Sequence, residues 1–154
     1  MKKQRPLISS SGVVRASHRV QRFTVKGRLP GQNEMIKAAK IGRRGGAYSS
    51  EKKKLTKSVA WMAIGAGLTP VEGRCFIRFL WHEPNKRRDY DNIRAGAKYI
   101  LDGLVQAGII QDDGWRCVTG LDDRFFKDKE DPRVVVQIIE WEEEPTPILS
   151  EEPA

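Results

Sequence analysis

The spacing of apolar residues between positions 74 and 141 limits how this chain can fold, because it changes from strand-like to helical and back. Residues 74–82 (RCFIRFLWH) are a short aromatic run with every second side chain on one apolar side, as in a buried strand. Residues 92–107 instead carry an apolar stripe at helical spacing, formed by Ile93, Ala97, Ile100 and Leu104. Residues 118–121 and 133–141 then predict two more strands.

The first half of the chain adds one strand and one helix. Residues 21–29 alternate apolar and polar side chains and stop at Pro30, which predicts a strand. Residues 32–49 contain several cations and a glycine-flanked arginine pair, and they predict a flexible loop that can close over a nucleic-acid backbone. Ser50 is a suitable N-cap for a helix that ends at residues 65–67. The predicted order is β-α-β-α-β-β, an α/β (α+β) fold.

The 154 residues suit a single compact domain, since domains most often have about 100–150 residues. Residues 1–20 predict a mobile basic arm, residues 21–141 the compact domain, and residues 142–154 an acidic flexible tail. No apolar run approaches the ~20 residues that a bilayer span needs, and none follows the basic N-terminus. We therefore expect no membrane segment and no secretory signal, and we place the protein in the cytoplasm.

The two cysteines, Cys75 and Cys117, lie far apart without a CxxC pair, and the chain has only two histidines. This spacing argues against a zinc site and against a disulfide framework. We expect two reduced and mostly buried thiols, because free cysteine behaves as a small apolar residue.

The charge of the chain favours a polyanionic partner. The formal net charge is +8. Residues 1–54 hold 15 Lys or Arg against only Glu34 and Glu51, whereas residues 140–154 hold six Glu and no base. Lysine and arginine bind DNA phosphates by neutralising charge and releasing counterions, so this distribution indicates a nucleic-acid ligand.

Two aspartates, Asp89 and Asp91, lie two positions apart in a stretch expected to be extended, where both would point to one side. Two carboxylates at such a short distance repel each other unless a divalent cation binds them. Oxygen ligands without His or Cys favour Mg²⁺, with Mn²⁺ as a substitute, over zinc. The chain turns back at Gly108 after the predicted helix, so Asp112 or Asp113 can supply a third carboxylate, and spacing does not distinguish the two.

The predicted helix adds a cation to this site. At 100° per residue Asp91, Lys98 and Asp102 fall within ~40° of one another, opposite the apolar stripe. Lys98 can therefore bind the scissile phosphate or offset the charge of a transition state. Four arginines are further candidates for gripping the DNA backbone: Arg43, Arg44, Arg87 and Arg88.

Each of these features also has a purely structural explanation. Asp91 can be an N-cap, residues 112–114 can form a turn, and Lys98 and the pair Arg87-Arg88 can be solvated charges. The combination of an acid pair, a helical lysine and returning acids on a basic chain is harder to obtain from folding requirements alone. It indicates a metal-dependent nuclease, with a non-catalytic DNA-binding accessory protein as the alternative.

At these residues the chain resembles the RusA family of Holliday junction resolvases, common in prophages, over roughly residues 26–141. Residues 88–92 (RDYDN) are similar to the family's R-D-x-D-N, residues 100–104 (ILDGL) to its helix centre, and residues 107–115 (AGIIQDDGW) to its A-G-x-x-x-D-D stretch. The family's lysine follows the second aspartate by four positions, where this chain has Ala95. Lys98 follows by seven, which we interpret as a three-residue insertion. Residues 29–33 and 47–49 resemble the family's P-x-x-N and basic loop only loosely.

The resemblance implies a homodimeric crossover junction endodeoxyribonuclease with a mixed sheet, acting in recombination and repair in a bacterial or phage-infected cell. It implies that Asp89, Asp91 and Asp113, rather than Asp112, are the catalytic Mg²⁺ ligands, with Lys98 as a fourth member of the site. Paired cuts in a four-way junction would leave 5′-phosphates. A nuclease for other branched DNA, such as a flap or fork, is an alternative of the same class.

Overall fold

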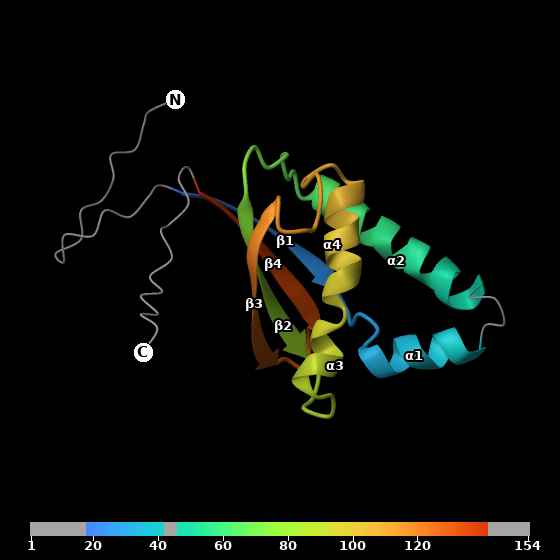
Figure 1. The fold of residues 1–154 in the computed structure, drawn as a ribbon. Helices are drawn as coiled ribbons and strands as arrows, with labels where there is room; N and C mark the ends of the chain where they lie inside the picture. The colour runs from blue at the N-terminus through green and yellow to red at the C-terminus, as the bar shows by residue number, and fades with distance from the viewer. Residues whose placement is uncertain (1–17, 42–45, 142–154) are drawn as a thin grey trace, which may run out of the picture.

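One four-stranded sheet forms the centre of the protein, in a computed structural model that describes residues 18–41 and 46–141 (Figure 1). The strands lie in the order β1-β4-β2-β3. Strand β4 is antiparallel to both β1 and β2, whereas β2 and β3 are parallel. The bounds are β1 (His18–Lys26), β2 (Cys75–Glu83), β3 (Val118–Lys127) and β4 (Arg133–Trp141). The single α/β domain with a mixed sheet, predicted from the sequence, is confirmed.

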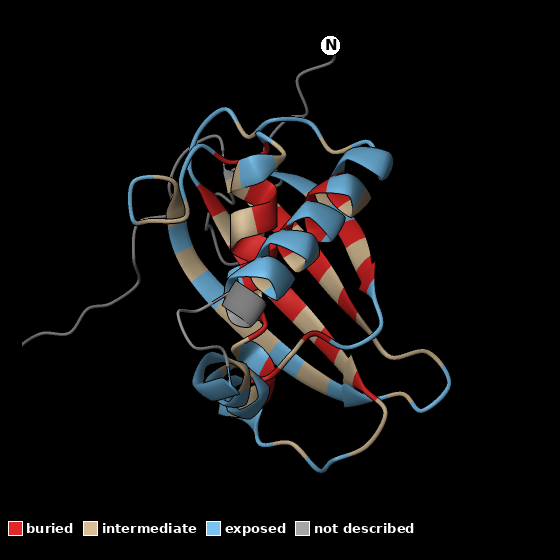
Figure 2. Cartoon of the chain, turned by 90° about the vertical axis from the view of Figure 1, so that its right-hand side faces the viewer, coloured by how far each residue is buried: buried red, intermediate tan, exposed pale blue. Residues whose placement is uncertain are grey.

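Two helices cover one face of this sheet, α2 (Gly46–Gly65) and α4 (Ala97–Gln106). Along β2 every second side chain is buried, beginning with Cys75, as the alternation in the sequence predicts. These side chains pack against apolar residues of the two helices, and Figure 2 shows the buried stripe where helices and strands meet. The core members from β2, α2 and α4 include Ile77, Phe79, Trp81, Val59, Ala63, Ile100 and Leu104.

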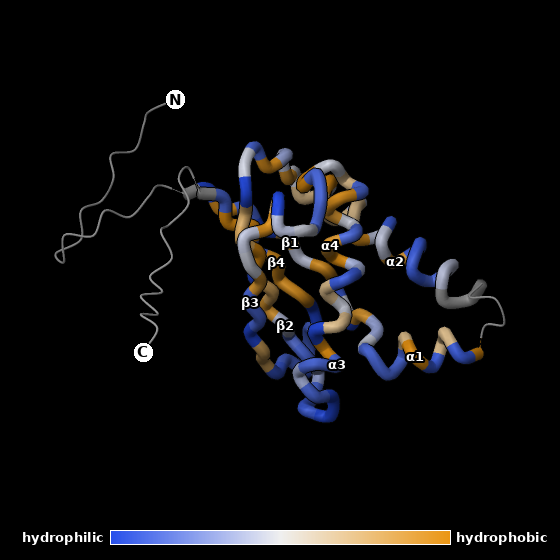
Figure 3. The backbone as a smooth tube through the Cα atoms, in the orientation of Figure 1, coloured by the Kyte–Doolittle hydropathy of each residue, from blue (hydrophilic) through white to orange (hydrophobic). Residues whose placement is uncertain are grey.

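The opposite face of the sheet carries half-exposed side chains such as Phe76 and Leu80, and no described helix lies over it. Figure 3 shows that hydrophobic segments concentrate in the strands and α4, whereas the chain around α3 (Tyr90–Arg94) is strongly hydrophilic. In the described part of the chain no helix has both the length and the apolar character needed to cross a bilayer.

The single helix predicted for residues 92–107 is two helices, α3 (Tyr90–Arg94) and α4. Between them the backbone is more tightly wound, because Gly96 N bonds to Ile93 O at 3.1 Å and Tyr99 N bonds to Gly96 O at 3.1 Å, both across three residues. A Cβ atom on Gly96 would lie 2.9 Å from the Cβ of Leu29. The break is therefore where the chain after β1 packs closely against this segment.

A loop was expected over residues 32–49, and that prediction is wrong at both ends: the first part forms helix α1 (Gln32–Ile41), and residues 46–49 belong to α2. None of its residues is fully buried, although the partly buried Met35 packs against the core. The available signal was Glu34, whose carboxylate accepts a hydrogen bond from Gly31 N, as in half of a capping box. Residues 42–45 of the expected loop lie outside the described residues.

The ends of several other elements differ from the prediction. Strand β1 begins at His18, which pairs with Trp141, so three residues assigned to the arm belong to the sheet. It ends at Lys26, before Gly27 with φ +81°, instead of at residue 29. Helix α2 begins at Gly46, a turn before the expected Ser50 cap, and β3 continues to Lys127. The rest of the arm and the tail lie outside the described residues.

Both cysteines are free, as predicted. Cys75 is fully buried in β2, and Cys117 is half-buried just before β3. Burial raises the pKa of the Cys75 thiol to about 11, with Glu140 and Cys117 adding to the effect. A thiol of this kind stays protonated and packs as an apolar group.

Candidate metal and DNA-binding site

The two aspartates of the predicted acid pair lie at the start of α3, and both are exposed. Asp89 is extended and precedes the helix, whereas Asp91 already lies in its first turn. The expectation that both occupy an extended stretch is therefore wrong for Asp91, and strand alternation does not place them on one side. They instead share the N-terminal end of a short helix, where the peptide dipoles favour negative charge.

The two acids also differ from most other aspartates in having no cationic partner among the described side chains. Six described aspartates form ion pairs with lysine or arginine, namely Asp102, Asp113, Asp122, Asp123, Asp128 and Asp131. Asp89 and Asp91 form none within residues 18–41 and 46–141. Their carboxylates thus offer uncompensated oxygen ligands, which is the donor chemistry that a hard cation such as Mg²⁺ prefers.

Lys98, in the first turn of α4, lies beside one of the two returning acids. Its Nζ is 3.5 Å from Oδ2 of Asp113 and 3.0 Å from Oδ1 of Asp102. The hydrogen bond with Asp102 is the main reason why the pKa of Lys98 is raised, although partial burial opposes the shift. Asp112 instead accepts a hydrogen bond from Gly114 N at 3.3 Å and closes a turn. The structure thus separates two neighbours that the sequence left equivalent.

The chain after α4 folds back along that helix before it enters β3, which is how Asp113 reaches Lys98 (Figure 1). The three predicted ligands nevertheless do not form one cluster. Within the described ranges no three side chains of His, Cys, Asp or Glu lie close enough together to hold a metal ion. A site made of Asp89, Asp91 and Asp113 would require the loop that carries Asp113, or the side chains themselves, to move.

Arg88 does not offer a surface for phosphate binding, contrary to the expectation from the sequence. Its side chain is only 10% exposed, and its guanidinium forms a short ion pair with the buried Glu83. Its Nη1 also donates to Leu29 O at 3.0 Å. These contacts fix the chain between β2 and α3, directly before Asp89. Arg87 is exposed, whereas Arg43 and Arg44 lie outside the described residues.

One residue of the site region escaped the analysis of the sequence, although it belongs to the RDYDN segment. Asn92 accepts a hydrogen bond from Asn33 N at 3.1 Å through its Oδ1. A Cβ atom on Gly31 would lie 2.3 Å from the same oxygen, so only glycine fits there without a shift. The RDYDN segment and the segment at residues 29–33, separated by about 60 positions, are therefore in direct contact.

The sequence matches no protein-family model and no curated protein sequence. Among solved structures, a chain in a crystal structure of a HypE–HypF complex is similar to this chain, with 12% sequence identity and a TM-score of 0.33. The similarity covers 79% of this chain, which spans about a third (31%) of the length of that one. A similarity at this TM-score indicates neither a shared fold nor a shared function.

Proposed function

We propose that this protein is a Mg²⁺-dependent endodeoxyribonuclease that cuts Holliday junctions, as does the RusA family that its motifs resemble. The ion pair between Lys98 and Asp113 carries the proposal, because it brings together a lysine and an acid that were both expected in the site. The contact between Asn92 and Asn33 supports it, because it joins two of the segments on which the resemblance rests. This chain has three more residues between the second aspartate and the lysine than the family pattern has. The break before α4 lies in that interval, between Asp91 and Lys98.

In this proposal the carboxylates of Asp89, Asp91 and Asp113 would hold the ion once the loop that carries Asp113, or the side chains, had moved. Mg²⁺ bound there would supply Lewis-acid chemistry to the scissile phosphate and to an attacking water molecule. Lys98 is a cation, whose pKa is raised chiefly by its hydrogen bond to Asp102, and it offsets negative charge that develops on the phosphate. The exposed Arg87 contacts the DNA backbone. A cytoplasmic homodimer would cut two opposed strands and leave 5′-phosphates.

A cleavage assay on a synthetic four-way junction tests the proposal. Wild-type protein should nick the junction with Mg²⁺ and not with EDTA. Asp89→Asn and Asp113→Asn should each reduce the rate by about a hundredfold or more, since each removes an anionic ligand of the ion that stabilises the transition state. Asp112→Asn is the matched control, because asparagine keeps the acceptor for Gly114 N and the turn, and its rate should stay near that of the wild type.

Retained cleavage in both Asp89→Asn and Asp113→Asn would refute the metal site. Junction binding without metal-dependent cleavage would favour the DNA-binding accessory protein. Flap and fork substrates at the same salt concentration distinguish a junction resolvase from a nuclease for other branched DNA, because salt alone changes affinity.

A further inference from the structure

A cavity of about 390 Å³ opens at the carboxyl ends of the parallel strands β2 and β3, next to the start of α3. In sheets of this kind, ligands commonly bind at that edge. The walls come from the end of β2, the segment before α3, α3 itself and the end of β3. Its lining includes Glu83, Lys86, Asp89, Tyr90, Phe126 and Lys127. Apart from Asp89, the proposed metal site uses none of these side chains.

Aromatic rings form the apolar part of this cavity and remain largely open to solvent. Tyr90 is 69% exposed, and its ring lies 4.4 Å from that of Phe125, centroid to centroid. Phe126 is 48% exposed and stacks on His82 at 4.9 Å. Exposed aromatic surface of this extent does not stabilise the fold, and a planar ligand can cover it by stacking.

Two lysines give the same cavity a cationic rim. Lys86 and Lys127 are exposed, and neither forms an ion pair with a described side chain. Of the two acids in the lining, Glu83 is already neutralised by Arg88 and by Arg28 at 3.1 Å, and Asp89 is the predicted metal ligand. Stacking rings beside free ammonium groups complement a nucleotide, whose base is planar and whose phosphates are anionic.

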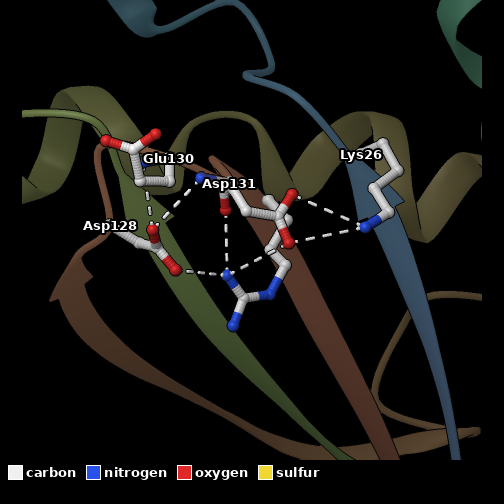
Figure 4. A network of polar contacts seen from close by, with 5 residues as sticks. Lys26, Asp128, Glu130 and Asp131 are labelled. Carbon is white, nitrogen blue, oxygen red and sulfur yellow. Dashed lines mark hydrogen bonds and ion pairs between the residues drawn. The ribbon is translucent and has the colours of Figure 1, made fainter.

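The wall that carries Phe126 and Lys127 is held in place by the turn that follows it. Asp128 N donates to Glu83 O at 2.7 Å, which ties the end of β3 to the end of β2. The Asp128 carboxylate accepts bonds from Glu130 N and Asp131 N and pairs with Arg133 at 2.8 Å (Figure 4). The hydrogen bond from Arg133 lowers the pKa of Asp128, in keeping with an ion pair that favours the charged carboxylate. The cavity is thus formed before any ligand arrives, which reduces the entropy lost on binding.

We propose that this cavity binds one unstacked base of the DNA substrate, with its ring against Tyr90 and Phe126 and the flanking phosphates at Lys86 and Lys127. The inference rests on the proposed DNA-cutting function and adds how the substrate is held. Because Asp89 lines the same cavity, the captured base would place a neighbouring phosphodiester beside the predicted metal ligands. Bases are most easily unstacked where duplex arms meet, which is the branch point of a junction.

The experiment measures binding in EDTA, where cleavage plays no part. Fluorescence anisotropy would compare a labelled thymine oligonucleotide with the same oligonucleotide bearing abasic sites. The wild type should bind the thymine form more tightly. Tyr90→Ala and Phe126→Ala should each weaken binding of the thymine form about fivefold or more, and leave the abasic form unchanged. Phe126→Tyr keeps a stacking ring and should bind the thymine form like the wild type. Phe126→Leu keeps apolar volume but has no ring, and it should bind the thymine form more weakly than the wild type does.

Equal binding of the thymine and abasic forms by the wild type would overturn the inference, as would equal weakening of both forms by the alanine variants. Free thymidine monophosphate presents the same base and a phosphate without a DNA chain. If it binds more tightly than the oligonucleotide, and loses binding in Phe126→Ala, the cavity belongs to nucleotides and not to DNA. Asp113→Asn, which should lose cleavage, should keep the preference for the thymine form, so failure of one proposal is distinguishable from failure of the other.

Discussion

Arg87 and Arg88 show how two adjacent residues of the same type take different roles. In the sequence both are cations beside an acid pair, and both fit phosphate binding. In the structure Arg87 faces solvent, while Arg88 is turned inward onto Glu83 and Leu29 O. Breaking a buried ion pair leaves one charge without its partner, which costs far more than losing a surface charge. Arg88 therefore acts by holding the chain from which Asp89 projects.

We predict that Arg88→Met lowers the free energy of unfolding by about 3 kcal/mol, at the lower end of the range for broken buried pairs. The loss is limited because Arg28 still contacts Glu83. Arg87→Met, at the exposed neighbour, should change stability by less than about 0.5 kcal/mol. Urea denaturation of the two variants measures both values. Equal destabilisation would contradict the inward placement of Arg88, and a double variant with Glu83→Leu should recover part of the loss.

At the scale of elements, the close approach of α2 and α4 fixes where the second half of the site lies. Gly103 of α4 faces α2, and a Cβ atom there would lie 2.6 Å from Cγ1 of Val59 and 3.1 Å from Thr56 O. Glycine weakens a helix interior, so its presence here reflects packing and not helix propensity. Because α4 carries Lys98, the position of this lysine depends on that contact.

We expect Gly103→Ala to destabilise the protein by about 1–3 kcal/mol through overpacking, although alanine is the better helix former. Gly65→Ala is the matched control, since no atom lies within 4 Å of a Cβ atom there, and it should be neutral or slightly stabilising. Thermal or urea unfolding distinguishes them. In combination with Val59→Ala the effect of Gly103→Ala should shrink, because the shortened side chain makes room. Strict additivity of the two changes would show that they do not share this contact.

At the scale of the whole molecule, α1 and the first part of α2 extend away from the sheet and the core (Figure 1). Their exposed cations include Lys37 and Lys40 on α1, while α1 itself buries none of its side chains. A helix that buries no side chain fully and presents lysines to solvent is suited to follow a DNA backbone. Residues 32–41 of the predicted flexible cationic loop are thus helical, and Lys37 and Lys40 lie on a helix.

If this projection binds DNA, the double variant Lys37→Ala/Lys40→Ala should weaken affinity and lower the slope of log K against log salt concentration by about one unit per lysine. The double variant Lys37→Arg/Lys40→Arg keeps both charges and should retain the slope. Anisotropy titrations at several salt concentrations give these slopes. An unchanged slope in the alanine variant would exclude α1 from the DNA interface.

Much of the fold could be predicted because it follows from local periodicity. The alternation in residues 74–82 and the β-branched run that begins at Val134 specify β2 and β4 with little help from distant contacts. The apolar stripe that contains Ile100 and Leu104 likewise specified α4. Helix α1 was missed because none of its side chains is fully buried and the loop prediction rested on its cations and on the glycines that follow it.

The sequence by itself determined the types of most elements, the basic character of the chain, and the short set of acids and cations from which a site can be built. Tertiary structure alone decided that Arg88 turns inward onto Glu83, that Asp113 rather than Asp112 meets Lys98, and that the helix breaks at Gly96. The reason is physical. Periodicity and charge belong to neighbouring residues, whereas burial and ion pairing depend on segments such as residues 29–33, which reach the site only when the chain folds.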